Sequence, residues 1–182
     1  STHCISSAAS DVYKRQLFSP DTELGRWLAT RNTMLRIGRN LFVHAGLSAR
    51  LLERDLEMDT LNARMSEGLY RTSKERREDP TLEFLYRSAG PVWYRGMVCA
   101  DEKYDPLTPE QTDALLRRYD ADRLLVGHTI FPDISTFHDG RVIAVNVQNE
   151  LNRRKNRGRA VLIEGSRISV VGNRGVKRVL EE

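Results

Sequence analysis

Apolar residues recur with helical spacing over most of the chain up to about residue 120, and this pattern predicts helices. The predicted helices span residues 19–31, 48–65, 81–88 and 107–120. Ser19 and Ser48 are expected to cap the first two, while Thr108 and Gln111 form the sequence of a capping box at the start of the last. The mixed-charge stretch 71–80 predicts a solvated helix face or a loop.

In the predicted helices, apolar side chains fall on one face. In the first helix these are Leu24, Trp27 and Leu28, and in the second they are Leu51, Leu52, Leu56 and Leu61. Residues at positions i, i+3 and i+4 lie on the same side of a helix, so we expect both faces to point towards the core.

Alternating or continuous short apolar runs predict strands in the rest of the chain. Residues 35–46 predict a hairpin with a buried second strand over 41–45. Further strands are expected within 123–127, 134–137, 141–147 and 160–172. Asp139–Gly140 and Gly165–Ser166 supply the turn residues of two more hairpins.

The order of these elements predicts an α/β (α+β layered) fold whose sheet ends in antiparallel hairpins. With 182 residues, the chain is about one domain long, and it shows no internal repeat or linker. Residues 1–16 lack apolar periodicity and look like translated adapter sequence, so we expect a non-native tail there and assign the fold to residues 17–182.

Composition excludes several classes of protein. No apolar run reaches the length of a membrane-spanning helix. Cys4 and Cys99 have neither the spacing of a zinc site nor the density of a disulfide framework. The formal net charge of +4 suits anionic substrates. The basic cluster at 153–159 has no interleaved aromatic residues, so we expect a solvated loop and no nucleic-acid partner.

Two histidines stand where apolar strands end. His44 follows the run in "LFVHAGLS" at 41–48, and His128 follows the run in "LLVGHTIF" at 124–131. Imidazole is the commonest metal ligand in proteins, and a strand end fixes the direction of its ring. Each histidine taken alone is also explained by a hydrogen-bonded role in the core, and two imidazoles without oxygen ligands do not complete a site with two metal ions.

Arg95 is the third candidate. In "GPVWYRG" at 90–96 it follows two aromatic residues inside a segment bounded by glycines. A guanidinium matches the geometry of phosphoryl oxygens and can donate two parallel hydrogen bonds to them. A surface arginine stacked on an aromatic ring is the alternative.

Other motifs are weaker. "GLSAR" lacks the second glycine of a nucleophile elbow, and "GNRG" at 172–175 is explained by a turn. The chain has no P-loop and no GxGxxG motif. His138 precedes the Asp139–Gly140 turn and is interpreted as a hairpin residue.

The segments "ELGRWL", "LFVHAGLS", "GPVWYRG", "VGHT" and "GRVIAVNV" occur in an order that resembles the Shewanella-like protein phosphatases of the calcineurin-like metallophosphoesterase superfamily. The resemblance covers residues 17–182. It implies part of a calcineurin-like β-sandwich flanked by helices, and a phosphatase of bacterial type that hydrolyses phosphate monoesters of proteins or of small molecules.

The resemblance also implies roles for the three candidates. His44 and His128 correspond to ligands of the second metal, and Arg95 corresponds to a phosphate clamp. In this family two divalent ions (Mn, Fe or Zn), about 3.5–4 Å apart, hold a hydroxide for in-line attack on phosphorus.

The sequence departs from the family in ways that limit this expectation. Ala45 replaces a frequent glycine, and Asn146 stands where an aspartate is common. The chain contains no Gly-Asp dipeptide and no GNHE, so the family motifs GDxHG, GDxxDRG and GNHE, which supply the first metal's ligands, are missing. We therefore expect this chain to be the C-terminal half of such a phosphatase and to be inactive by itself.

Two other functions stay open at this point. The chain could be a non-catalytic module that binds phosphorylated or acidic partners through Arg95 and the cluster at 153–159. It could also hold one metal ion with carboxylates such as Asp101 or Asp133, although their spacing in the sequence does not indicate this.

Overall fold

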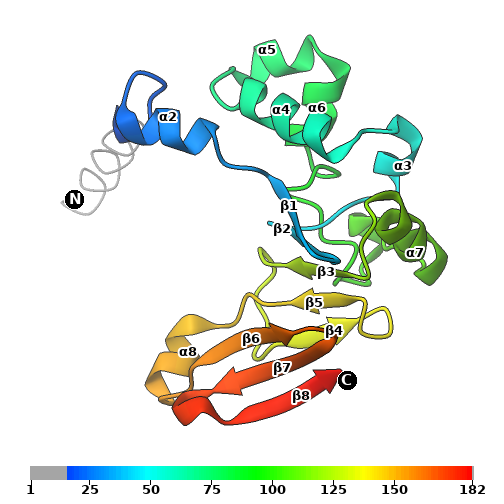
Figure 1. The fold of residues 1–182 in the computed structure, drawn as a ribbon. Helices are drawn as coiled ribbons and strands as arrows, with labels where there is room; N and C mark the ends of the chain where they lie inside the picture. The colour runs from blue at the N-terminus through cyan, green and yellow to red at the C-terminus, as the bar shows by residue number, and fades with distance from the viewer. Residues whose placement is uncertain (1–15, 182) are drawn as a thin grey trace.

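The computed structural model describes residues 16–181, whose arrangement is shown in Figure 1. The expected non-native tail at 1–16 lies, except for its last residue, outside the described residues. The described chain forms two sheets and a group of helices. No helix in residues 16–181 is long and apolar enough to cross a membrane.

A mixed five-stranded sheet has the strand order β1-β2-β3-β5-β4. Its strands are β1 (Met34–Ile37), β2 (Asn40–Val43), β3 (Arg123–Val126), β4 (Ser135–Phe137) and β5 (Val142–Ala144). The central strands β2, β3 and β5 are parallel to one another, while β1 and β4 pair antiparallel at the two edges. The predicted hairpin is therefore present as β1 and β2, although its second strand ends at Val43, before His44.

A second sheet is antiparallel throughout and consists of β6 (Arg159–Glu164), β7 (Arg167–Gly172) and β8 (Lys177–Glu181). The predicted turn at Gly165–Ser166 joins β6 to β7, with Glu164 opposite Arg167. A short 3-10 helix, η2 (Asn173–Gly175), makes the expected turn before β8. Strand β8 has three charged residues among five and was not predicted from the apolar pattern.

The helices are α2 (Glu23–Ala29), α3 (Arg50–Arg54), α4 (Met58–Gly68), α5 (Ser73–Arg77), α6 (Pro80–Tyr86), α7 (Pro109–Arg118) and α8 (Asn149–Arg154), with a 3-10 helix η1 (Glu102–Tyr104). The start of α7 confirms the predicted capping box, since Thr108 and Gln111 bond reciprocally to each other's backbone N–H. Helix α5 has no buried residue, as the mixed-charge stretch indicated.

Two predictions about the first helix are wrong. Its N-cap is Thr22 rather than Ser19, because the Thr22 hydroxyl accepts a hydrogen bond from the N–H of Gly25 at 3.0 Å. Its apolar face is not in the core: Leu24 is 40% exposed and Trp27 is 53% exposed. Figure 1 shows the reason, since α2 projects away from the sheets and helices that make up the body of the molecule.

The helix predicted over 48–65 is broken into α3 and α4. Asp55 has a positive φ of 48°, a left-handed conformation that a continuous helix cannot contain. Ser48 does not cap α3; it is buried and its hydroxyl donates to the carbonyl of Ala89 at 2.8 Å. Leu51 and Leu61 are nevertheless fully buried, as their spacing predicted.

The hairpin between β4 and β5 has a longer loop than predicted. Phe137 and Val142 are the last paired residues, so residues 138–141 form the connection instead of Asp139–Gly140 alone. His138, Asp139 and Gly140 all have positive φ. Such a conformation depends on the surrounding structure and leaves little signal in the sequence.

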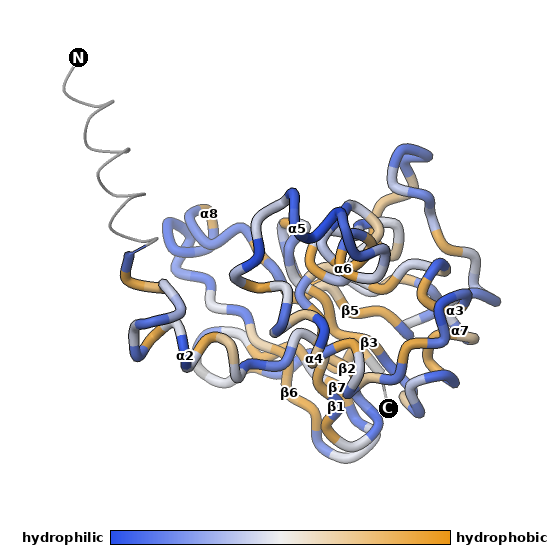
Figure 2. Tube along the Cα trace, turned by 90° about the horizontal axis from the view of Figure 1, so that it is seen from above, coloured by the Kyte–Doolittle hydropathy of each residue, from blue (hydrophilic) through white to orange (hydrophobic). Residues whose placement is uncertain are grey.

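The two faces of the five-stranded sheet have different partners. One face contributes Leu41, Leu124 and Val142 to a core that it shares with the helices. The other contributes Leu125 and Ile143 to a smaller core with Ile168 and Val170 of the second sheet. Figure 2 shows hydrophobic residues along these strands and hydrophilic residues over α5 and α8. The result is a mixed α/β molecule in which two sheets pack together and helices cover one side.

Candidate active site

His44 and His128 are brought together by two neighbouring parallel strands. β2 and β3 end side by side, with Val43 opposite Val126. His44 comes directly after β2, and His128 follows β3 with only Gly127 between. The N–H of Gly127 donates to the carbonyl of His44 at 2.8 Å, which ties the two strand ends together. Because parallel strands end at the same edge of a sheet, both imidazoles lie at that edge.

The two imidazole rings are in contact, with their planes inclined at 63°. Nε2 of His44 is 3.1 Å from Nδ1 of His128, and the ring centroids are 5.0 Å apart. His128 has a positive φ of 60°, so its backbone takes a conformation that non-glycine residues seldom adopt. Its other ring nitrogen, Nε2, is buried and has no hydrogen-bond partner among the described residues. An unpartnered buried nitrogen is costly, which favours a ligand at this atom.

The charge state of His128 follows from its surroundings. Partial burial disfavours the charged imidazolium and is the main reason why the pKa of His128 is lowered below its usual value of 6.5. The positive charge of Arg95 and the neighbouring His44 lower this pKa further. His128 is therefore neutral at pH 7 and has a lone pair available.

Arg95 is placed near the histidines by the segment 90–99, which folds back against the residues after His44. The carbonyl of Pro91 accepts hydrogen bonds from the N–H groups of Ala45 at 3.0 Å and Gly46 at 3.4 Å. A side chain at Gly46 would come within 3.1 Å of the carbonyl oxygen of Tyr94, so the two segments pack backbone to backbone. The guanidinium of Arg95 lies over the ring of Tyr104, 5.6 Å from its centroid.

The expected aromatic support for Arg95 differs in detail from the structure. Tyr94 is buried, and its hydroxyl donates to the carbonyl of Asp105 at 2.5 Å. Trp93 instead contacts a histidine: its indole meets the ring of His128 edge to face, with centroids 5.5 Å apart. No sequence pattern predicted that Trp93 contacts His128, because local patterns do not link residues in such distant segments.

No carboxylate joins the histidine pair in the described part of the chain. Within residues 16–181, no group of three or more His, Cys, Asp or Glu side chains could hold a metal ion. Asp101 pairs with Lys103 at 2.8 Å, and Asp133 pairs with Arg159 at 2.7 Å. The described residues therefore do not support a single-metal site completed by Asp101 or Asp133.

The remaining candidates have structural partners. His138 Nδ1 lies 3.2 Å from the hydroxyl of Thr112, and its Nε2 lies 3.1 Å from the carbonyl of Met97. In the basic cluster at 153–159, Arg157 bonds the side chain of Asn152 and Arg159 bonds Asp133.

Asn146 lies beside the site, with its Cβ 4.0 Å from the position of a Cβ on Gly127. Cys99 is a free thiol.

Comparison with known proteins gives matches only among solved structures. No protein-family model matches the chain, and no curated protein matches it significantly. The cold-active protein tyrosine phosphatase of a psychrophilic Shewanella species is similar, with a TM-score of 0.81 and 28% sequence identity over 91% of this chain. A structure of a cold-active protein tyrosine phosphatase at 1.1 Å gives the same TM-score with 29% identity over 92% of this chain, and a point mutant gives 28% over 91%.

The chain spans about half the length of these phosphatases, since the matches cover 47% to 48% of each of them. Within that half, the similarity extends over nearly all described elements. The chain therefore has the architecture of part of a phosphatase, and the similarity supports a phosphatase relationship.

Proposed function

We propose that the protein is a metal-dependent phosphomonoesterase of the calcineurin-like type, in which His44, His128 and Arg95 belong to the active site. The observation that carries this proposal is the histidine pair, with facing ring nitrogens 3.1 Å apart at the ends of two parallel strands. The similarity to protein tyrosine phosphatases supports a phosphorylated substrate, and phosphotyrosine is the first to test.

The histidine pair fits part of the ligand set of a divalent metal ion. The lowered pKa leaves His128 unprotonated at neutral pH, and its buried Nε2 has no partner among the described residues. Imidazole suits Mn, Fe and Zn. The described residues add no carboxylate to this pair, so they do not complete a site with two metal ions. Such an ion, when bound, supplies polarisation of the phosphoryl oxygen and activation of water.

The other residues act on the substrate and on the histidines. Arg95 carries a fixed positive charge next to His128, where it can donate two hydrogen bonds to a phosphoryl group and offset its negative charge. Trp93 packs against the edge of His128 and holds its ring direction. The hydrogen bond from Gly127 to the carbonyl of His44 keeps the two strand ends in register. These residues therefore bind the phosphoryl group and orient the two histidines.

The test is hydrolysis of p-nitrophenyl phosphate and of a phosphotyrosine peptide by the protein encoded by the complete reading frame that contains these 182 residues. We expect turnover with Mn²⁺, loss after chelation, and a fall of at least about 100-fold in kcat/KM for Arg95→Gln, since a charged contact made to the transition state is worth about 3 kcal/mol. Arg117→Gln, an exposed arginine on α7, is the matched control. Turnover that survives both chelation and Arg95→Gln would refute the proposal.

A further inference from the structure

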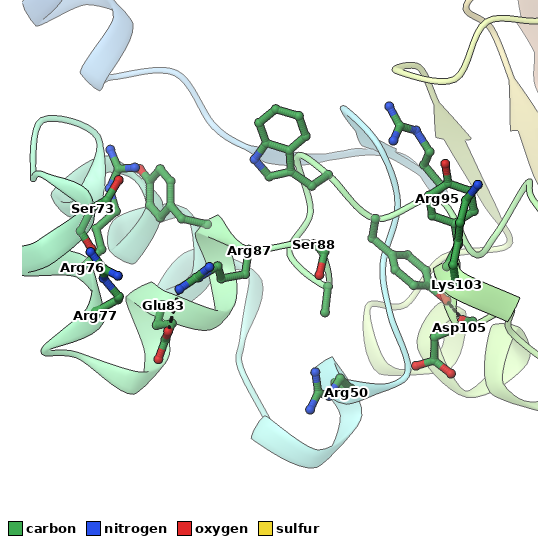
Figure 3. A pocket seen from close by; sticks show the side chains of 15 residues that line it. Arg50, Ser73, Arg76, Arg77, Glu83, Arg87, Ser88, Arg95, Lys103 and Asp105 are labelled. Carbon is green, nitrogen blue, oxygen red and sulfur yellow. Dashed lines mark hydrogen bonds and ion pairs between the residues drawn. The ribbon is translucent and has the colours of Figure 1, made fainter.

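A basic pocket adjoins the histidine pair. It has a volume of about 550 Å³, within the range of ligand pockets, and it is formed by α5, α6, the start of α3, the segment after α6 and the residues around η1. Figure 3 shows its charged side chains in two groups, with Arg76, Arg77, Glu83 and Arg87 on one side, Arg95, Lys103 and Asp105 on the other, and Arg50 between them. The cationic residues among its lining are Arg50, Arg76, Arg77, Arg87, Arg95 and Lys103, against the acidic residues Glu83 and Asp105.

Much of this positive charge is not neutralised by the protein. Arg87 pairs with Glu83 at 3.2 Å, and Lys103 pairs with Asp101 at 2.8 Å. In residues 16–181, no carboxylate lies within ion-pair distance of Arg50, Arg77 or Arg95. Like charges gathered in a concave surface repel each other and raise the local potential, so an anion is the ligand that this pocket favours.

Part of the pocket wall is already fixed in position. The guanidinium of Arg76 donates to the carbonyls of Gly68 at 2.8 Å and Leu69 at 3.0 Å, and it stacks over the ring of Tyr86 at 3.9 Å. Nε of Arg77 donates to the carbonyl of Ser73 at 3.1 Å, which leaves its terminal nitrogens for other partners. A preformed set of donors binds an anion with a smaller loss of side-chain entropy.

The pocket borders the candidate active site, since two of its lining residues, Trp93 and Arg95, also belong to that site. Arg95 lines the pocket, and its segment is hydrogen-bonded to the residues after His44 through the carbonyl of Pro91. Trp93 also lines the pocket and contacts His128. A phosphate bound at Arg95 therefore lies in the pocket that Arg50 and Arg77 also line.

We propose that this pocket binds a second anionic group of the substrate, next to the phosphate that is hydrolysed, and that the substrates are accordingly phosphopeptides with a second phosphate or with acidic side chains beside the phosphorylated residue. The substrate assignment rests on the proposed function, whereas binding of the anion does not. A pocket of about 550 Å³ that includes Arg95 favours a short peptide over a nucleic-acid strand, because the phosphates along such a strand need an extended basic groove.

The test uses Trp93 as a reporter. The chain has two tryptophans, so Trp27→Phe in the 182-residue chain leaves Trp93 as the single indole. Its fluorescence is followed in EDTA, where turnover is suppressed, with three phosphotyrosine peptides whose flanking residues are glutamine, glutamate or phosphoserine. We expect the two anionic peptides to bind at least about 10-fold more tightly than the glutamine peptide, as one or two charge-assisted contacts allow. The glutamate and phosphoserine peptides distinguish carboxylate from phosphate as the preferred group.

Variants in the same background assign the preference to the pocket. Arg50→Gln and Arg77→Gln should each reduce the preference for the anionic peptides over the glutamine peptide to about threefold or less. Arg77→Lys should retain most of this preference, and Arg117→Gln should leave it unchanged. Both arginines are exposed, so the variants are expected to fold, and circular dichroism checks this. Equal affinity for the three peptides, or tighter binding of a single-stranded oligonucleotide, would overturn the inference.

Turnover separates this inference from the proposed function. A preference for anionic peptides in a full-length protein without phosphatase activity would support the anion site and refute the enzyme. Turnover with no difference among the three peptides would refute the anion site and leave the enzyme in place.

Discussion

The indole of Trp93 meets the imidazole of His128 edge to face, with centroids 5.5 Å apart and ring planes at 89°. Trp93 is also 53% exposed and lines the basic pocket. Trp93 thus contacts His128 of the histidine pair and also lines the basic pocket. This contact links the chemistry proposed for His128 to the recognition proposed for Arg50 and Arg77.

The histidine pair predicts weak metal binding by the 182-residue chain. We expect calorimetry with Mn²⁺ to give a Kd above about 10 μM, because two imidazoles supply only part of a ligand set. His44→Ala and His128→Ala should each abolish this binding. His138→Ala should retain it, since His138 bonds Thr112 and Met97 instead. Binding that survives in His44→Ala would contradict the assignment.

The same chain is expected to show little or no turnover of p-nitrophenyl phosphate with Mn²⁺, because no carboxylate accompanies the two imidazoles in residues 16–181. Initial rates measured over a range of enzyme concentrations check this expectation. A metal-dependent rate close to that of an intact protein tyrosine phosphatase, assayed in parallel, would show that it is wrong.

Gly90→Ala should destabilise the segment that carries Arg95. A Cβ at position 90 would lie 2.0 Å from the carbonyl oxygen of Leu85, which is backbone and cannot turn aside. We expect a loss of about 2–4 kcal/mol in the free energy of unfolding, measured by urea titration.

Gly165→Ala is the comparison variant for Gly90→Ala. Position 165 has a positive φ of 64° and no atom within 4 Å of a Cβ, so only backbone strain of about 1–2 kcal/mol is expected. Equal losses for the two variants would argue against the close approach at Gly90.

Asn62→Ala should detach α4 from the sheet edge. The buried amide of Asn62 accepts from the N–H of Met34 at 2.9 Å and donates to its carbonyl at 2.8 Å. Its removal leaves both backbone groups without these partners, at a cost of about 2–3 kcal/mol. Thermal unfolding followed by circular dichroism measures the loss, and exposed Asn149→Ala is the control.

Asp79 predicts a stability change at acid pH. Its ion pair with Arg64 and its hydrogen bonds to the N–H groups at the start of α6 lower its pKa below the usual value. A carboxylate with a lowered pKa in the folded state stabilises the protein above its unfolded pKa of about 3.9, and this contribution is lost as pH falls through the folded pKa. The free energy of unfolding should therefore decrease as the pH falls below about 4.

Asp79→Asn tests this assignment, because asparagine keeps the cap and removes the charge. The variant should be less stable than the wild type at pH 7, and the difference should shrink as pH falls below about 4. Arg64→Gln should flatten the same part of the profile. A wild-type pH profile in Asp79→Asn would assign the acid sensitivity to other carboxylates.

Local sequence determined the elements whose signals lie within a few residues. The capping box fixed the start of α7, and turn residues at Gly165–Ser166 fixed the hairpin of β6 and β7. Apolar runs placed His44 and His128 beyond the ends of buried strands. These predictions succeeded because hydrogen bonds between near neighbours and the alternation of side chains are local properties.

Tertiary structure decided what depends on contacts between distant segments. The sequence did not show that β2 and β3 are parallel neighbours, and it is this pairing that places the two imidazoles 3.1 Å apart. It also did not show that α2 leaves the body of the molecule with Trp27 exposed, or that Arg50 and Arg77 share a pocket with Arg95. Strand pairing and side-chain packing select such arrangements only when the whole chain folds, so no short window of sequence contains them.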